Sequence, residues 1–160
     1  MASSLDPRSL DTGTLALFAG QAAAALVQDQ LADQGFGDLR FSHGYVFQHL
    51  IDGEPTVGEL AARLAMTQQG ASKVVAELER LGYCERTPDA SDARIRRVRL
   101  TVRGRDAVDA ARGARTALDR RLAERFGEKR LAEHRDLLVR LLDELGGTPA
   151  VERRAVPPPR

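Results

Sequence analysis

The stretch LAARLAMTQQGASKVVAELERLG, residues 60–82, predicts two helices joined by a tight turn. Leu60 and Leu64 stand four residues apart, as on one face of a short helix. In the second helix the apolar side chains recur every three or four residues, which is typical of one buried face. They are Ala71, Val74, Val75, Leu78 and Leu81. Thr67 is a suitable N-cap for this helix and Gly82 a suitable stop.

Polar residues lie off that apolar stripe, near the start of the second helix: Gln68, Gln69, Ser72 and Lys73. Together with Thr67 they can exchange hydrogen bonds with base edges and phosphates. We therefore expect this face to enter the major groove of DNA. The alternative is an ordinary solvated helix face.

A hairpin is predicted directly after the second helix. Two strands, residues 83–87 and 95–101, flank a polar turn at 88–92. Alternation in the second strand sends Val98 and Leu100 toward the core, and Arg97 and Arg99 toward solvent or a phosphate backbone. Thr56 and Val57 are expected to pair briefly with these strands. The pattern predicts a mainly α fold with a small β-wing, a winged helix-turn-helix domain with additional helical arms.

Positive charge is concentrated in the predicted wing. From Arg86 to Arg105 there are seven arginines and two acidic residues, a net charge of +5. The whole chain carries only +1, so the residues outside this window sum to −4. A cationic patch beside a candidate recognition helix indicates a protein that binds double-stranded DNA.

The segment from about Leu31 to Gly104 resembles the MarR family of bacterial transcriptional regulators, and the order of helices resembles that family over the whole chain. The residues that carry the resemblance are Gly58–Ala61, Gly70–Val75, Leu78–Glu79, Gly82–Tyr83, Glu85–Arg86, Asp92–Arg94, Val98–Thr101 and Gly104. Two positions depart from the family pattern. Gly70 stands where the family often has Thr or Ser, and Lys73 where Arg is common; both concern base preference.

The resemblance implies roles for the wing residues. In similar proteins a wing arginine enters the minor groove and an aspartate holds it by a salt bridge, which corresponds here to Arg94 and Asp92. Arg96 and Arg97 are further expected wing contacts. The resemblance also implies a homodimer, a palindromic operator read with sequence specificity, and a repressor that a small ligand releases. No cofactor is expected.

Five segments are predicted along the chain. Residues 1–8 form a flexible N-terminus, and residues 9–55 form helices for dimerisation and a candidate ligand pocket. The winged helix-turn-helix occupies residues 56–101, further dimerisation helices residues 102–146, and a disordered tail residues 147–160. The terminal helices have apolar faces that need a partner. That partner is either the rest of the same chain or, as the resemblance implies, a second copy of it.

A small-molecule pocket is the second site that the resemblance implies. In similar proteins it lies between the first helix, the second helix and the long helix after the wing, and an aromatic or phenolic effector is expected here. The candidate lining residues are Phe18, His43, Tyr45, Phe47, His49 and Arg115. The alternative is a helix surface with a buried tyrosine and partly exposed histidines. His43 and His49 are six residues apart and share no helix face, so no metal site is predicted.

Composition excludes other classes of function. Aromatic residues are 4% of the chain and Trp is absent, which disfavours single-strand binding by base stacking. Cys84 is the single cysteine, so no intramolecular disulfide can form, and we expect it to be buried and inert. Neither a secretory signal nor a convincing membrane span is evident. With the resemblance, this predicts a bacterial cytoplasmic protein that joins the nucleoid through DNA and has no membrane partner.

Two other functions stay open from the sequence. A nonspecific architectural DNA-binding protein would need a broadly basic surface, which the −4 outside the wing disfavours. A winged-helix protein-interaction module would not need a concentrated cationic wing. An enzyme finds no support, because there is no glycine-rich phosphate loop, metal-ligand cluster or nucleophile–base set.

Overall fold

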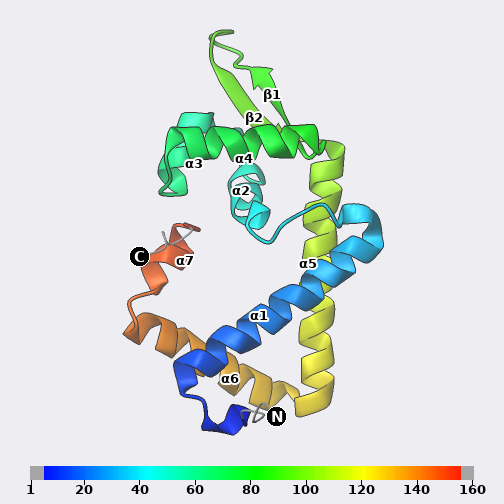
Figure 1. The fold of residues 1–160 in the computed structure, drawn as a ribbon, viewed down its shortest axis with the longest axis vertical. Helices are drawn as coiled ribbons and strands as arrows, with labels where there is room; N and C mark the ends of the chain where they lie inside the picture. The colour runs from blue at the N-terminus through cyan, green and yellow to red at the C-terminus, as the bar shows by residue number, and fades with distance from the viewer. Residues whose placement is uncertain (1–5, 156–160) are drawn as a thin grey trace, which may run out of the picture.

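Two long arms extend below a compact head that carries the wing at its top (Figure 1). This is a computed structural model, and it describes residues 6–155. The elements in chain order are η1 (Pro7–Ser9), α1 (Thr12–Leu31), η2 (Ala32–Phe36), α2 (His43–Leu50), α3 (Val57–Arg63), α4 (Gln68–Arg80), β1 (Cys84–Pro88), β2 (Arg96–Leu100), α5 (Val102–Phe126), α6 (Glu128–Glu144) and α7 (Thr148–Glu152). The predicted fold class, mainly helical with a two-stranded wing, is confirmed.

Helices α3 and α4 form as the sequence predicts. Thr56 and Glu59 make a capping box at the start of α3, and the Thr67 side chain accepts a hydrogen bond from the Gly70 backbone N–H at the start of α4. Between them the chain turns sharply, with Ala65 at a φ of 52°. The apolar stripe of α4 is buried at Ala71, Val75 and Leu78 and half-buried at Val74 and Leu81.

The wing is an antiparallel pair in which Cys84 lies opposite Leu100 and Pro88 opposite Arg96. Val98 and Leu100 are buried, as alternation predicts. A bridge between Thr56 and Arg97 adds the short third pairing that was expected there. Because the Val98 N–H also donates to the Pro55 carbonyl at 2.9 Å, the wing is attached to the segment that begins α3.

Tyr83 lies at the centre of the head and is fully buried. Its ring packs against those of Phe36 and Phe47, with centroids 6.3 and 6.0 Å away. Its hydroxyl donates to the Asp38 carboxylate. The Arg103 guanidinium stacks over the Tyr83 ring, 4.6 Å from its centroid, and donates to the same hydroxyl at 2.9 Å. One side chain thus joins the α1–α2 connection, the start of β1 and the start of α5.

Gly104 allows α5 to start directly against this centre. A Cβ at this position would overlap the Tyr83 carbonyl oxygen and would lie 3.0 Å from a Leu100 methyl carbon. The same carbonyl accepts a hydrogen bond from the Thr101 N–H at 3.1 Å, so it cannot move away freely. Only a residue without a side chain fits here.

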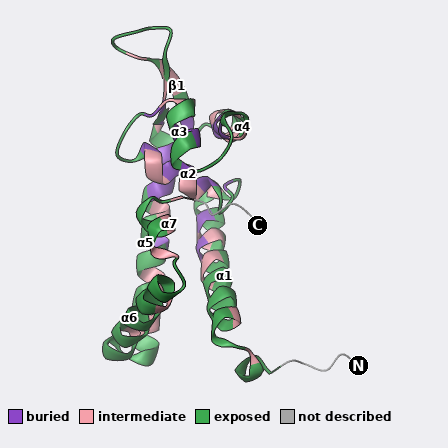
Figure 2. Ribbon diagram, turned by 90° about the vertical axis from the view of Figure 1, so that its left-hand side faces the viewer, coloured by how far each residue is buried: buried purple, intermediate pink, exposed green. Residues whose placement is uncertain are grey.

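The arms, which are α1, α6 and most of α5, are far less buried than the head, which contains α2, α3, α4 and the base of the wing (Figure 2). Helices α1 and α5 contact each other through Val27, Leu31 and Ala114, whereas α6 has no buried residue. Large apolar side chains therefore remain exposed along α1 and α6.

Three boundaries differ from the sequence prediction. The apolar pattern from Leu39 to Ile51 predicts a helix that starts at Leu39, but α2 begins at His43, because residues 37–42 form a non-helical connection after η2. The predicted disordered tail instead contains α7, where Pro149 presets the helical backbone and Arg154 donates to the Gln48 carbonyl at 3.0 Å. Within the predicted flexible N-terminus, Asp6 caps η1. Residues 1–5 and 156–160 lie outside the described part of the chain.

Replacing Gly104 with alanine is predicted to lower the free energy of unfolding by about 1–3 kcal/mol, as overpacking typically does. Gly113→Ala is the matched control in the same helix, because nothing lies within 4 Å of its added Cβ. That control should raise the free energy of unfolding by up to about 1 kcal/mol through helix propensity. Urea denaturation at one protein concentration measures both. Equal stability of the two variants would contradict the tight packing at Gly104.

Candidate functional site

The exposed face of α4 presents the predicted polar residues. Gln68, Gln69 and Lys73 are exposed, and Ser72 is half-buried. Thr67 is exposed as well, but its hydroxyl oxygen accepts the Gly70 N–H at 3.1 Å and so begins the helix. The first turn of α4 therefore offers amide, hydroxyl and ammonium groups to a ligand outside the protein.

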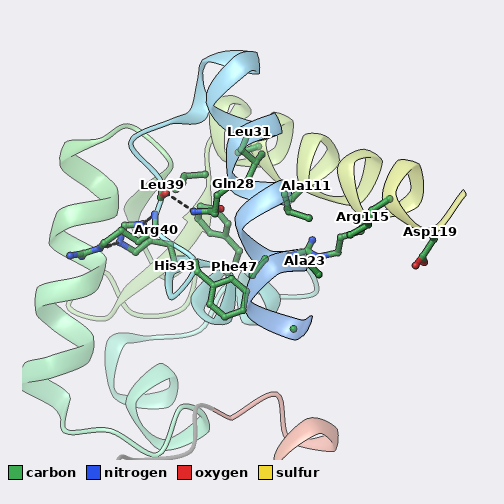
Figure 3. Close-up of a pocket in the computed structure, with 17 residues that line it drawn as sticks. Ala23, Gln28, Leu31, Leu39, Arg40, His43, Phe47, Ala111, Arg115 and Asp119 are labelled. Atoms are coloured by element: carbon green, nitrogen blue, oxygen red, sulfur yellow. Dashed lines mark hydrogen bonds between the residues drawn. The ribbon is translucent and has the colours of Figure 1, made fainter. Parts of the chain in front are cut away.

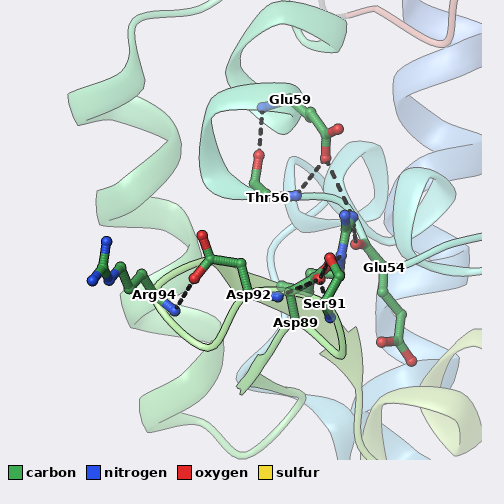
Figure 4. A network of polar contacts seen from close by, with 8 residues as sticks. Glu54, Thr56, Glu59, Asp89, Ser91, Asp92 and Arg94 are labelled. Atoms are coloured by element: carbon green, nitrogen blue, oxygen red, sulfur yellow. Dashed lines mark hydrogen bonds and ion pairs between the residues drawn. The ribbon is translucent and has the colours of Figure 1, made fainter.

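At the tip of the wing, Arg94 and Arg96 are exposed, and within residues 6–155 neither guanidinium makes an ion pair or hydrogen bond. The Asp92 carboxylate accepts the Arg94 backbone N–H at 2.9 Å, while the Arg94 side chain points away from the neighbouring polar contacts (Figure 4). The expected salt bridge between these two side chains is therefore not formed. An aspartate two residues before an N–H readily makes this backbone turn instead.

Arg97 is not free, contrary to its predicted role as a solvent-facing or phosphate-facing wing residue. Its guanidinium pairs with the Asp89 carboxylate and donates to the Glu54 carbonyl at 3.0 Å. The Glu59 carboxylate lies 3.8 Å away. The turn before β2 and the capping box of α3 bring these acceptors to Arg97, which alternation along β2 alone could not reveal.

The other arginines of the basic window also have partners. Arg86 pairs with Glu79 at 3.2 Å, and Arg99 pairs with Glu85 at 2.8 Å. Arg103 contacts Asp38 at 3.3 Å, and Arg105 donates to the Leu100 carbonyl at 2.8 Å. Most of the carboxylates lie outside the window, so counting charge along the sequence overstated its free cations. The unpaired charge is concentrated at the wing tip.

A separate cavity of about 320 Å³ lies between α1, α2 and α5 (Figure 3). Of the six predicted pocket residues it brings together His43, Phe47 and Arg115. The sequence missed Gln28 and Arg40, which also line it. Gln28 was detectable in principle as a polar residue close to the apolar positions of α1.

The other three predicted pocket residues lie elsewhere. Phe18 is 55% exposed on α1, outside the cavity. Tyr45 packs its ring edge-on against Phe41, with centroids 5.8 Å apart. His49 faces α7, with its Nε2 3.3 Å from the Arg154 carbonyl oxygen. The helical turns of α2 separate these side chains, so one short stretch of sequence supplies two different surfaces.

His43 is almost completely buried, which corrects the alternative for this histidine, whereas His49 is half-buried, as that alternative expected. The Arg40 backbone N–H donates to the Nδ1 of His43 at 3.1 Å, and the Arg40 guanidinium lies against the His43 Nε2, with Nε at 3.4 Å and Nη2 at 3.2 Å. Burial, followed by the charge of Arg40, holds the pKa of His43 below its ordinary value of 6.5. The imidazole is therefore neutral near pH 7 and completes the cavity wall without adding charge.

Cys84 is buried, as expected, with its thiol directed at the Val75 carbonyl. Burial raises the pKa of this thiol to about 12, so the reactive thiolate is scarce at neutral pH. Across residues 6–155, His, Cys, Asp and Glu side chains nowhere gather as a set of three able to hold a metal ion. No helix in the same range combines the length and apolar character needed to cross a membrane.

Comparison with known proteins agrees with this geometry. A family model described as MarR family matches residues 38–95. The solved transcriptional regulator PA4135 is similar, with 29% identity and a TM-score of 0.57 over 86% of this chain and 96% of that one. No curated protein sequence matches the chain.

Two S. aureus structures are also similar, each over 86% of this chain and 99% of the other. One is a MepR variant bound to an oligodeoxyribonucleotide, with 20% identity and a TM-score of 0.63. The other is MepR bound to ethidium bromide, with 21% identity and a TM-score of 0.61. The segment that the family model matches contains the helix-turn-helix, β1 and the turn of the wing. The similarity to the solved structures extends further, into the arms. Residues 38–95 thus match the MarR family model, and the chain as a whole shares the fold of these solved proteins.

Proposed function

We propose that this protein is a homodimeric regulator that binds a palindromic DNA operator with sequence specificity and acts as a repressor released by a small ligand. The observation that carries the proposal is the presence, on one head, of an exposed polar α4 face and of two wing-tip arginines that have no partner within residues 6–155. A protein that coats DNA without specificity would need a broadly basic surface. Here most arginines of the wing region are already neutralised by nearby acceptors.

In the proposed complex, α4 lies in the major groove. Gln68, Gln69, Ser72 and Lys73 then stand where hydrogen bonds to base edges and phosphates form. Arg94 enters the adjacent minor groove and Arg96 contacts the phosphate backbone. The MepR variant solved with an oligodeoxyribonucleotide supports DNA as the ligand of this fold.

The second subunit is proposed to cover the apolar arms. The exposed large apolar residues of α6 are Leu137, Leu138, Val139 and Leu142, with Leu145 at its C-cap, and on α1 they include Leu15, Leu17 and Phe18. Covering these side chains would remove apolar surface from water, which favours association. A twofold dimer would also present two α4 helices to the two halves of a palindrome.

The cavity between α1, α2 and α5 is the proposed effector site. It joins the arms to the head, so a molecule bound there could favour one spacing of the two recognition helices over another. Its lining includes Phe47, Arg40 and Arg115, and this mixture of aromatic, apolar and basic residues suits an aromatic or phenolic effector. The ethidium complex of MepR supports an aromatic ligand for this fold.

Arg94→Ala is predicted to weaken binding to the selected operator at least about tenfold, as expected when a good groove contact of ~1–3 kcal/mol is lost. Arg99→Ala is the matched control, because this wing arginine is already paired with Glu85 at 2.8 Å. It should change affinity by less than about threefold, in line with an exposed ion pair worth ~1 kcal/mol or less. Mobility-shift titrations measure both, and equal losses would contradict the role of the wing tip.

Leu138→Asp combined with Leu141→Asp is predicted to convert the dimer into monomer or aggregate and to lower operator affinity. Both leucines lie on α6. Burying the introduced carboxylates against the second subunit without a charge partner would be costly. Ala132→Asp adds one carboxylate on another exposed face of α6 and should leave the dimer intact. Light scattering distinguishes these outcomes. A double variant that stays dimeric with native stability would exclude α6 from the interface.

A further inference from the structure

We propose that Arg97 is a positioning residue for DNA binding: it fastens the wing to the start of α3 and so determines where Arg94 and Arg96 stand relative to α4. The inference rests on the proposed function, since it concerns how the wing reaches DNA. It assigns Arg97 a role different from phosphate contact, which its place in an arginine-rich strand would suggest.

The guanidinium of Arg97 joins three separate segments. Its Nε donates to the Asp89 carboxylate in the turn between the strands. Its Nη1 donates to the Glu54 carbonyl at 3.0 Å, in the loop before α3, and lies 3.8 Å from the Glu59 carboxylate in the first turn of α3. A planar guanidinium holds several acceptors in fixed directions, which a lysine ammonium cannot do.

The backbone strengthens the same junction. Thr56 bridges to Arg97, and the neighbouring Val98 N–H donates to Pro55. The Thr56 N–H donates to the Glu59 carboxylate at 2.7 Å, while the Thr56 hydroxyl oxygen accepts the Glu59 N–H at 3.2 Å. Glu59 therefore completes the α3 cap and faces Arg97 with the same carboxylate oxygen (Figure 4).

Asp89 carries the constraint from Arg97 to the wing tip. Its other oxygen accepts the Ser91 N–H at 2.8 Å and the Asp92 N–H at 3.3 Å. Asp92 in turn accepts the Arg94 backbone N–H. A continuous series of contacts thus runs from the α3 cap through Arg97 and the turn to Arg94.

The charges in this group argue against a phosphate contact by Arg97. Two carboxylates, Asp89 and Glu59, face one guanidinium, so the group has a net charge of −1. The Ser91 hydroxyl, followed by Arg97, holds the pKa of Asp89 well below its usual range, and the carboxylate stays ionised near neutral pH. A phosphate approaching Arg97 would meet these carboxylates, whereas one approaching Arg94 or Arg96 meets a free cation.

The test compares affinity with its salt dependence for Arg97→Gln and Arg94→Ala on the selected operator. We expect Arg97→Gln to lose about tenfold or more in affinity while the slope of log K against log salt stays at the wild-type value. Loss of a phosphate contact would instead reduce that slope by about 0.9 for each subunit. A reduced slope for Arg97→Gln, or unchanged affinity, would overturn the positioning role.

Two further variants test the two roles, and Asp89→Asn gives opposite signs for them. Asp89→Asn keeps an oxygen to accept the turn N–H groups but removes the charge that holds Arg97. A positioning role predicts weaker DNA binding, whereas a phosphate-contacting Arg97, freed from its carboxylate, would bind DNA more tightly. Arg97→Lys keeps the charge without the planar fork and should also bind DNA more weakly. Tighter binding by Asp89→Asn, or wild-type affinity for Arg97→Lys, would overturn the proposal.

Amide hydrogen exchange in the protein without DNA provides a readout independent of binding. The Val98 and Ile95 N–H groups, bonded to Pro55 and Asp92, should exchange faster in Arg97→Gln while amides of α5 stay protected. Unchanged exchange would contradict the proposal that Arg97 fastens the wing to the start of α3. If the wild type selects no DNA, or Arg94→Ala binds as the wild type does, the proposed function fails instead. Wild-type binding with an Arg94 effect and no Arg97 effect refutes only this inference.

Discussion

The packing of Tyr83 against Gly104 is the constraint on which the rest of the structure depends. Because Gly104 has no side chain, α5 begins against the Tyr83 carbonyl, at the point where the wing returns to the head. The Tyr83 ring and hydroxyl hold Phe36, Phe47 and Asp38 from the α1–α2 side. Burial, followed by the hydrogen bond with Asp38, raises the pKa of Tyr83 to about 12, so the phenol keeps its proton. The arms and the head therefore meet at one buried contact centred on Tyr83.

Around this contact, ion pairs distribute the positive charge unevenly. Four arginines that support the fold are paired with carboxylates: Arg86, Arg97, Arg99 and Arg103. Within residues 6–155, Arg94 and Arg96 at the wing tip have no such partner. The wing thus has a supported base and a cationic tip. The free charge therefore lies at the wing tip, above the head that carries α4, whereas the exposed apolar side chains lie along the arms.

Local patterns in the sequence were sufficient to predict the main elements. The stripe from Ala71 to Leu81 predicted α4, and the alternation at Val98 and Leu100 predicted the buried side of β2, since both depend on near neighbours. Ion pairing depends on residues distant in sequence, so the partners of Arg97 and Arg103 could not be predicted in this way. The separation of His43 from His49, and the docking of α7 through Arg154, likewise depend on which neighbour each helix face meets.

Selection of bound sequences from a random pool of double-stranded DNA tests the central claim most directly, because the shape of the recovered motif reports both specificity and symmetry. If two α4 helices are presented by a twofold dimer with wings on either side, the motif is a palindrome whose half-sites are centred about one helical turn, or ~10 base pairs, apart. Recovery of unrelated sequences with no motif, or of a single half-site without symmetry, would contradict the account.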